Sequence, residues 1–312
     1  MSSSGSSLKL LLSACVALLA TWAAAAAPSC PPPVQVAVGA AGAERDRGLL
    51  WKVSRDGRTS WLYGTLHVGK PTWRRFGPQM NAALKASDVL ALEIDPGDPA
   101  LLDALSEIRS PASLPDALQT RLAKAFERAC VAGESMATLH PVLQASTLTV
   151  LEARWLGMDP SYAMEQLLAT QARGAGRKVV SLETIAQQKA ALVPDDPDDA
   201  LAVLEQTLSQ LEDKSGRRVL DKLAQAWERG DLPALEDYEA WCECVANEAE
   251  KTFMRKLNDE RNPPLADGIE AQHKAGKRVF AAVGALHMTG PQSLPKLMQQ
   301  RGFKVERVSF VR

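Results

Sequence analysis

The sequence predicts an α/β fold with a mostly parallel central sheet, an N-terminal hairpin, and helical insertions that flank and cap the sheet. Two observations lead to this fold class. Short apolar, β-prone runs alternate along the chain with segments of helical spacing, and such alternation implies crossover connections between parallel strands. Two longer stretches show helical spacing alone. The 312 residues suffice for one large domain with an ample core, which we place at 49–312.

The expected elements follow in chain order. The runs 49–54 and 59–66 flank an Asp-Gly turn, which predicts a hairpin. Beyond the hairpin, apolar periodicity predicts further helices and strands. The helices are expected at 78–86, 161–173 and 294–300, with one more that ends near Gly276, and the strands at 89–94, 178–182, 278–283 and 303–310. The stretches of about 99–156 and 197–257 lack strand signals, so we interpret them as helical insertions over one end of the sheet.

The composition excludes two broad classes of protein. The chain has 36 basic and 37 acidic side chains, a net charge of −1, with 46% hydrophobic and 23% charged residues. These are ordinary globular values, which argue against disorder. A balanced charge also argues against a nucleic-acid partner, because such binding relies on a large positive surface.

The first residues have the pattern of a targeting segment. A weakly positive start that contains Lys9 is followed by an apolar run at about 10–22 and then by alanines. This order predicts a secretory signal peptide at 1–26, followed by a flexible N-terminal segment at 27–48; an uncleaved membrane anchor is the alternative. No later run reaches the roughly 18 apolar residues that span a bilayer. We therefore expect an exported protein, periplasmic or secreted, with no stable membrane span after cleavage.

Four cysteines would remain in the exported chain: Cys30, Cys130, Cys242 and Cys244. In an oxidising compartment such thiols are more often bridged than free, and four of them allow three pairings. A bridge between Cys242 and Cys244 would be strained at that spacing. We therefore expect each of these two to pair with Cys30 or Cys130, and in particular one of them to reach Cys130. A Cys-x-Cys metal or redox site is the alternative interpretation.

Ionisable side chains follow four of the expected strands. Two distant strands run into the motif Gly-x-Leu-His, which ends at His67 and at His287. The two strands between them in the chain lead to Glu93 and Glu183. Parallel strands would bring all four groups to the carboxyl edge of the sheet, where open α/β sheets bind ligands. Two imidazoles with one or two carboxylates are a plausible ligand set for a divalent metal.

A histidine after a strand is more often a structural residue than a ligand, but two of the four histidines share one context here. We expect His67, Glu93 and His287 to converge on one cavity, within about 8 Å of each other, as ligands of a shared metal would. Leu66 and Leu286 precede the two histidines, and strand alternation should turn them toward the opposite face.

These motifs resemble those of a known family. The matching stretches are 61–69, 87–95, 157–159, 176–184, 261–262 and 283–287. Together they resemble the TraB/GumN/TIKI family, which is defined by paired Gly-x-x-His motifs, and most of all its bacterial GumN-like branch. The resemblance covers about 49–308.

The resemblance implies a metal-dependent hydrolase fold related to the erythromycin-esterase-like group. Animal TIKI members are described as metalloproteases that use manganese- or cobalt-type ions, so a divalent ion of this type is the expected cofactor. The family motifs fall on His67, Glu93 and His287 as metal ligands. Arg261 and Asn262 match a polar pair that comes before the last motif.

The predicted function is metal-assisted hydrolysis of an amide (peptide) or ester bond by an exported protein. A bound water supplies the nucleophile, and Glu183 completes the metal shell or acts as general base. Arg261 stabilises the developing oxyanion, with Asn262 as a hydrogen-bond donor; for Arg261, a simple ion pair with an acidic neighbour is the alternative. A second class of function is a non-catalytic exported binding protein that uses the same cleft for a peptide, lipid or glycan fragment.

Overall fold

The computed structural model describes residues 30–34, 44–101, 104 and 114–310. Its centre is a six-stranded sheet with the order β4-β3-β5-β2-β1-β6. The strands are β1 (Leu49–Arg55), β2 (Arg58–Thr65), β3 (Val89–Leu92), β4 (Lys178–Ser181), β5 (Val279–Gly284) and β6 (Lys304–Val308). β2, β3, β4 and β5 pair in parallel, whereas β1 is antiparallel to both β2 and β6. The predicted fold class is therefore confirmed.

Helices surround this sheet. They are α1 (Pro78–Lys85), α3 (Asp116–Ala129), α4 (Pro141–Leu151), α5 (Met164–Gly174), α6 (Ile185–Leu192), α7 (Pro197–Glu212), α8 (Ser215–Glu228), α9 (Leu232–Glu236), α10 (Tyr238–Trp241), α11 (Glu248–Leu257), α12 (Asn262–Lys274) and α13 (Leu294–Gln300). A short 3-10 helix, η5 (Ala285–Met288), follows β5 directly. Within the described residues, no helix combines the length and apolarity that a membrane crossing requires.

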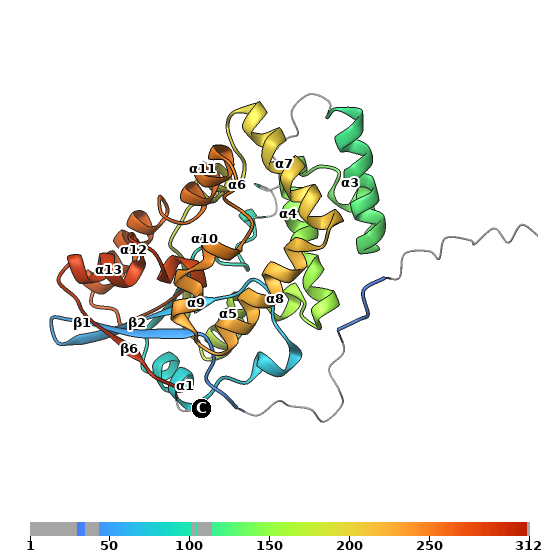
Figure 1. Ribbon diagram of the computed structural model, residues 1–312. Helices are drawn as coiled ribbons and strands as arrows, with labels where there is room; N and C mark the ends of the chain where they lie inside the picture. The colour runs from blue at the N-terminus through green and yellow to red at the C-terminus, as the bar shows by residue number, and fades with distance from the viewer. Residues whose placement is uncertain (1–29, 35–43, 102–103, 105–113, 311–312) are drawn as a thin grey trace, which may run out of the picture.

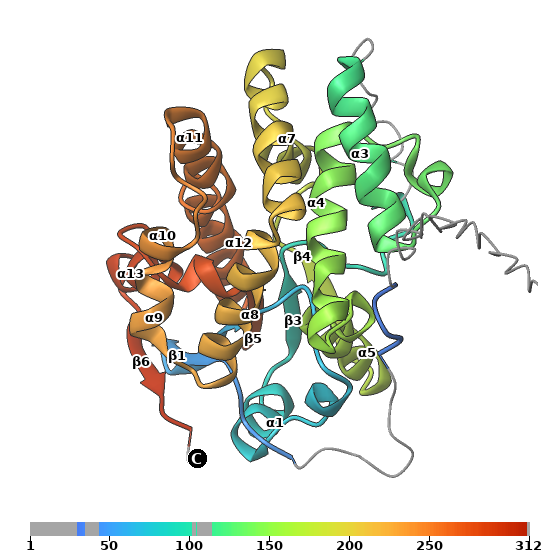
Figure 2. The same cartoon turned by 45° about the vertical axis from the view of Figure 1, so that its right-hand side comes forward.

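Strand alternation divides the core into two layers. Tyr63 and Phe280 lie in a cluster on one face with residues of α1 and α5, and Leu62 and Ala281 lie in a second cluster with residues of α12 and α13. The two helix pairs lie on opposite sides of the sheet (Figure 2). Because both faces are covered, the strands read as continuous apolar runs in the sequence.

A third core lies apart from the sheet. Leu122 of α3, Leu148 of α4 and Leu204 of α7 are buried in one cluster. Figures 1 and 2 show these three helices side by side above the sheet. The helices fall within the two stretches, about 99–156 and 197–257, where helical insertions were expected, and they pack mainly on one another.

The segment before β1 is partly fixed to the domain. The carboxylate of Asp46 accepts hydrogen bonds from the backbone N–H groups of Gln79 and Met80 at the start of α1, and Gly48 N–H donates to the carbonyl of Trp227 at 3.1 Å. The expected flexible segment 27–48 is therefore held at its end. The predicted signal peptide lies outside the described residues.

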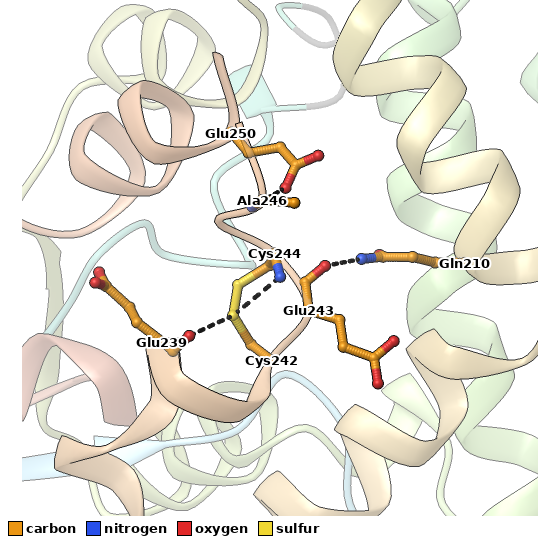
Figure 3. Close-up of a disulfide and its surroundings, with 7 residues drawn as sticks. All are labelled: Gln210, Glu239, Cys242, Glu243, Cys244, Ala246 and Glu250. Carbon is orange, nitrogen blue, oxygen red and sulfur yellow. Dashed lines mark hydrogen bonds between the residues drawn. A yellow bond between two sulfur atoms is a disulfide. The ribbon is translucent and has the colours of Figure 1, made fainter. Parts of the chain in front are cut away.

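The disulfides differ from the expected pairing. Cys30 bonds to Cys130 and Cys242 bonds to Cys244, with Cα separations of 5.6 Å and 5.1 Å, so the prediction that Cys130 pairs with one of the last two cysteines was wrong. Glu243 adopts a left-handed φ of 55°, which turns the chain back and brings its two neighbours within the usual disulfide range of about 4.4–6.8 Å. Figure 3 shows this loop held to α7, where Gln210 donates to the Glu243 carbonyl.

Candidate active site

The parallel register brings the carboxyl ends of four strands to one edge of the sheet. In the pairing of β2 with β5, Thr65 lies opposite Gly284, and in that of β3 with β4, Leu92 lies opposite Ser181. Each of the four ionisable residues predicted at strand ends follows its strand within three residues. Their backbones therefore lie together where α/β folds bind ligands.

Three of the predicted side chains converge beside Gly284. A Cβ placed on Gly284 would lie 3.3 Å from Glu93 Oε1, 3.5 Å from His287 Cδ2 and 3.9 Å from His67 Nε2. The three side chains line one cavity of about 420 Å³, together with Arg261. The expected convergence is thus present, and the missing side chain of Gly284 leaves the space between the three groups open.

Glu165 contacts the ring nitrogen of His67 that faces away from the cavity. The Nδ1 of His67 lies 3.0 Å from Oε1 of Glu165, and the same carboxylate oxygen accepts a short hydrogen bond from the hydroxyl of Thr65. The charge of Glu165 raises the pKa of His67 to about 9, although desolvation acts in the opposite direction. The imidazole is 63% exposed and presents Nε2 toward the cavity.

Sequence reasoning missed Glu165, which lies in the first turn of α5. Its only local signal is the general preference for acidic residues at helix starts, and that preference does not single out one carboxylate.

His287 is buried and is held by Asn262. Its Nδ1 lies 2.7 Å from the side-chain oxygen of Asn262, and burial lowers the pKa of His287 to about 4. The neutral ring therefore donates its Nδ1–H to Asn262 and keeps a lone pair on Nε2, which lies 3.6 Å from Glu93 Oε1. The side-chain nitrogen of Asn262 is buried and has no hydrogen-bond partner within the described residues.

Arg261 bridges the two predicted glutamates. Its Nε and Nη2 donate to the two oxygens of Glu183 at 2.8 and 2.6 Å, and Nη2 also contacts Glu93 Oε2 in a short ion pair. The second oxygen of Glu93 accepts from the N–H of Gly284 at 2.6 Å. Burial alone would raise the pKa of Glu93, but the facing groups of His287 and Arg261 lower it to about 2.

Two of the predicted residues stand behind this cavity. Glu183 lies behind Arg261, with both oxygens engaged, and Asn262 lies behind His287. Leu66 and Leu286 both border the cavity beside the histidines. The expectation that they face away was wrong for Leu286, which is half-buried, whereas Leu66 also packs in the core cluster with residues of α1 and α5, as expected. The reason for the difference at Leu286 is that the chain after Gly284 is a 3-10 helix, so strand alternation no longer applies.

The donor types suit a divalent metal, whereas the distances between the donors do not complete a metal-binding site. Both histidines have Nδ1 on an acceptor and Nε2 free, the usual arrangement of metal-binding histidines. Among residues 30–34, 44–101, 104 and 114–310, however, no three His, Cys, Asp or Glu side chains are placed to hold a metal ion. Arg261 and Gly284 hold the carboxylate of Glu93, and His67 would have to lose a proton to become a ligand.

Comparison with known proteins identifies the family. An uncharacterized protein, YbaP of Shigella flexneri, is 25% identical over 253 residues, which cover 78% of this chain and 88% of YbaP. YbaP of Escherichia coli (strain K12), also described as uncharacterized, is 24% identical over 275 residues, covering 80% and 97% of the two chains. No solved structure matches the chain. The TraB/PrgY/gumN family model matches residues 49–307, so this protein belongs to the TraB/PrgY/gumN family, as its motifs predicted.

Proposed function

We propose that this protein is an exported hydrolase that cleaves an amide (peptide) or ester bond with a divalent, manganese- or cobalt-type ion held by His67, Glu93 and His287. The observation that supports the proposal is the convergence of two imidazoles and one carboxylate on the open space beside Gly284. An ion bound there would lower the pKa of a water and polarise the carbonyl of the substrate.

The surrounding side chains position these three groups. Glu165 and Asn262 fix the two imidazole rings by their Nδ1 atoms, which leaves both Nε2 atoms toward the cavity. Mutation of such partners of metal-binding histidines typically lowers metal affinity or activity by 10- to 100-fold. Asn262 orients the ring of His287. The orientation of His287 does not require the predicted role of Asn262 as a donor to the oxyanion.

Arg261 is the cation that would stabilise a developing oxyanion. It lines the cavity and is buried, so its charge acts through little water. Glu183 holds the guanidinium with both oxygens. We therefore assign Glu183 the positioning of Arg261 in preference to the roles of metal ligand or general base.

Export remains part of the proposal. The two disulfides suit an oxidising compartment, and the apolar run at 10–22 suits a cleaved signal peptide. Expression of the full chain followed by N-terminal sequencing of the periplasmic or secreted product should find a start close to residue 27.

Metal analysis with a hydrolysis screen tests the proposed reaction. The purified protein should retain about one equivalent of manganese or cobalt, and hydrolysis of peptide or ester libraries should depend on it. His67→Ala and His287→Ala should lose both properties. His140→Asn is the matched control, because the His140 side chain caps α4 by accepting from Val142 N–H, lines neither cavity at the candidate active site, and Asn caps helices well.

Two outcomes would contradict the proposal. Failure of the parent protein to bind the ion would remove the metal site. Metal binding without turnover of any peptide or ester would favour the alternative of an exported binding protein.

A further inference from the structure

The candidate active site lies where two cavities meet. One cavity, of about 420 Å³, opens among α4, α6, α8 and α11. A second, of about 690 Å³, extends toward residues 160–166 before and within α5. His67, Glu93 and Gln188 line both cavities. A molecule bound across the candidate active site would therefore have one part in each of them.

The first cavity, which we name the apolar cavity, is lined beyond the candidate active site mainly by aliphatic side chains. They come from four helices and from η5: Val150, Leu192, Leu220, Leu223, Leu257 and Leu286. Each of them is only half-buried, so part of its apolar surface faces the hollow. Covering such apolar surface stabilises a complex, because it removes that surface from water.

The second cavity differs in chemistry. Ser161, Glu165 and Gln166 contribute polar groups to its lining, beside apolar residues such as Ile94, Pro96 and Leu101. Beyond the candidate active site the apolar cavity is mainly aliphatic. The apolar cavity therefore suits an aliphatic group, and the second cavity adds hydrogen-bonding groups for a more polar part of the same molecule.

We propose that the apolar cavity binds an aliphatic group next to the scissile carbonyl of the substrate, while the polar remainder extends into the second cavity. This inference rests on the proposed hydrolase function for the reaction, but the binding does not depend on turnover. The group is an acyl chain or the side chain of an apolar amino acid. When the substrate is an ester, hydrolysis joins the water oxygen to the carbonyl carbon and breaks the bond between that carbon and the alcohol oxygen. The alcohol leaves with one proton of the water.

A chain-length series tests the proposal. With ethyl acetate, butyrate and hexanoate, kcat/KM of the metal-loaded protein should rise about two- to fourfold for each methylene, since a buried methylene contributes about 0.8 kcal/mol, or fourfold. N-acetyl-leucine and N-acetylglycine ethyl esters form a second arm. A steeper rise of kcat/KM along the acyl series identifies the group as an acyl chain. A larger ratio between the leucine and glycine esters identifies it as an amino-acid side chain.

A matched pair of variants locates the effect. Leu192→Trp fills the apolar cavity from the end of α6 and should flatten the chain-length dependence. Ile185→Trp is the control, because Ile185 is also half-buried, lies on the same helix and is not among the residues that line either cavity. An unchanged dependence in Leu192→Trp, or an equal loss in Ile185→Trp, would overturn the proposal.

Calorimetry separates this proposal from the proposed reaction. The parent protein should bind hexanamide with a negative heat-capacity change and should not bind acetamide measurably. Hexanamide binding without hydrolysis of any peptide or ester would retain the apolar cavity and refute the hydrolase. Hydrolysis at equal rates for all chain lengths, with no hexanamide binding, would retain the hydrolase and refute the inference. Both measurements use the parent protein, so they decide the matter even where Leu192→Trp fails to fold.

Discussion

Replacement of Gly284 by alanine should lower the proposed activity about tenfold or more and leave the fold intact. The residue has φ −48°, which any L-amino acid adopts, so the backbone needs no glycine. The added methyl would lie 3.3 Å from Glu93 Oε1, its closest neighbour. That contact requires the carboxylate to shift by a few tenths of an ångström. The loss of chain entropy in the unfolded state favours alanine by about 0.4–1 kcal/mol, which offsets most of the cost.

The net change in the free energy of unfolding should therefore be below about 1 kcal/mol, a shift in Tm of roughly 2–4 °C at most. The methyl also enters the space between His67, Glu93 and His287. Displacement of reacting groups by fractions of an ångström to 1 Å costs up to about 100-fold, so we expect metal affinity and kcat/KM to fall about tenfold or more.

The assay pairs a thermal melt with metal titration and the hydrolysis screen, and Gly174→Ala is the control. Gly174 ends α5, and a Cβ there would meet nothing within 4 Å, so this variant should keep its activity and gain a little stability. Full metal binding and turnover in Gly284→Ala would show that the space beside Gly284 is not the reaction site. A large drop in Tm would show that the glycine is required by packing.

Three further predictions concern single contacts. Glu165→Gln keeps a hydrogen-bonding side chain but removes the charge, so the pKa of His67 should fall from about 9 toward the ordinary 6.5; histidine titration by NMR on metal-free protein checks this, and an unchanged pKa would refute it. Hydrogen bonds from Arg278 lower the pKa of Asp88 to about 2. The stability that Asp88 contributes is therefore complete above its unfolded pKa near 4 and is lost as pH falls toward 2. Asp88→Asn should flatten that acid limb in denaturation at varied pH. Trp227→Phe should cost about 1–3 kcal/mol in denaturant unfolding, because the buried indole N–H donates to the carbonyl of Gly64 at 2.7 Å; a loss below 0.5 kcal/mol, an estimate of the smallest net hydrogen-bond contribution, would contradict this.

The features that could be predicted from the sequence are those that local patterns determine. Each strand is a short apolar run, and the parallel pairing of β2, β3 and β5 places the residues after those runs at one edge. The repeated Gly-x-Leu-His motif therefore located His67 and His287, and the end of an apolar run located Glu93. These three positions follow from strand ends alone, without knowledge of how the helices pack.

The features that escaped prediction depend on long-range packing. Glu165 meets His67 across 98 positions of sequence, because α5 docks against the end of β2, and no pattern around either residue encodes that contact. The pairing of Cys242 with Cys244 depends on one backbone angle at Glu243. Loop length and redox compartment, the guides available from sequence, do not report such an angle.

The charges of the candidate active site add a further argument about its ligand. Three carboxylates, those of Glu93, Glu165 and Glu183, face one guanidinium and one imidazolium, while burial keeps His287 neutral. One negative charge is therefore uncompensated in a largely buried cluster, which is costly. A divalent cation that displaced the proton of His67 would leave the cluster neutral, whereas a monovalent cation that displaced it would leave the same deficit. This charge balance supports the proposed divalent ion for a reason independent of the type of donor atom. Within that proposal Arg261 has a second role: without its charge, the same three carboxylates would require more positive charge than one such ion supplies.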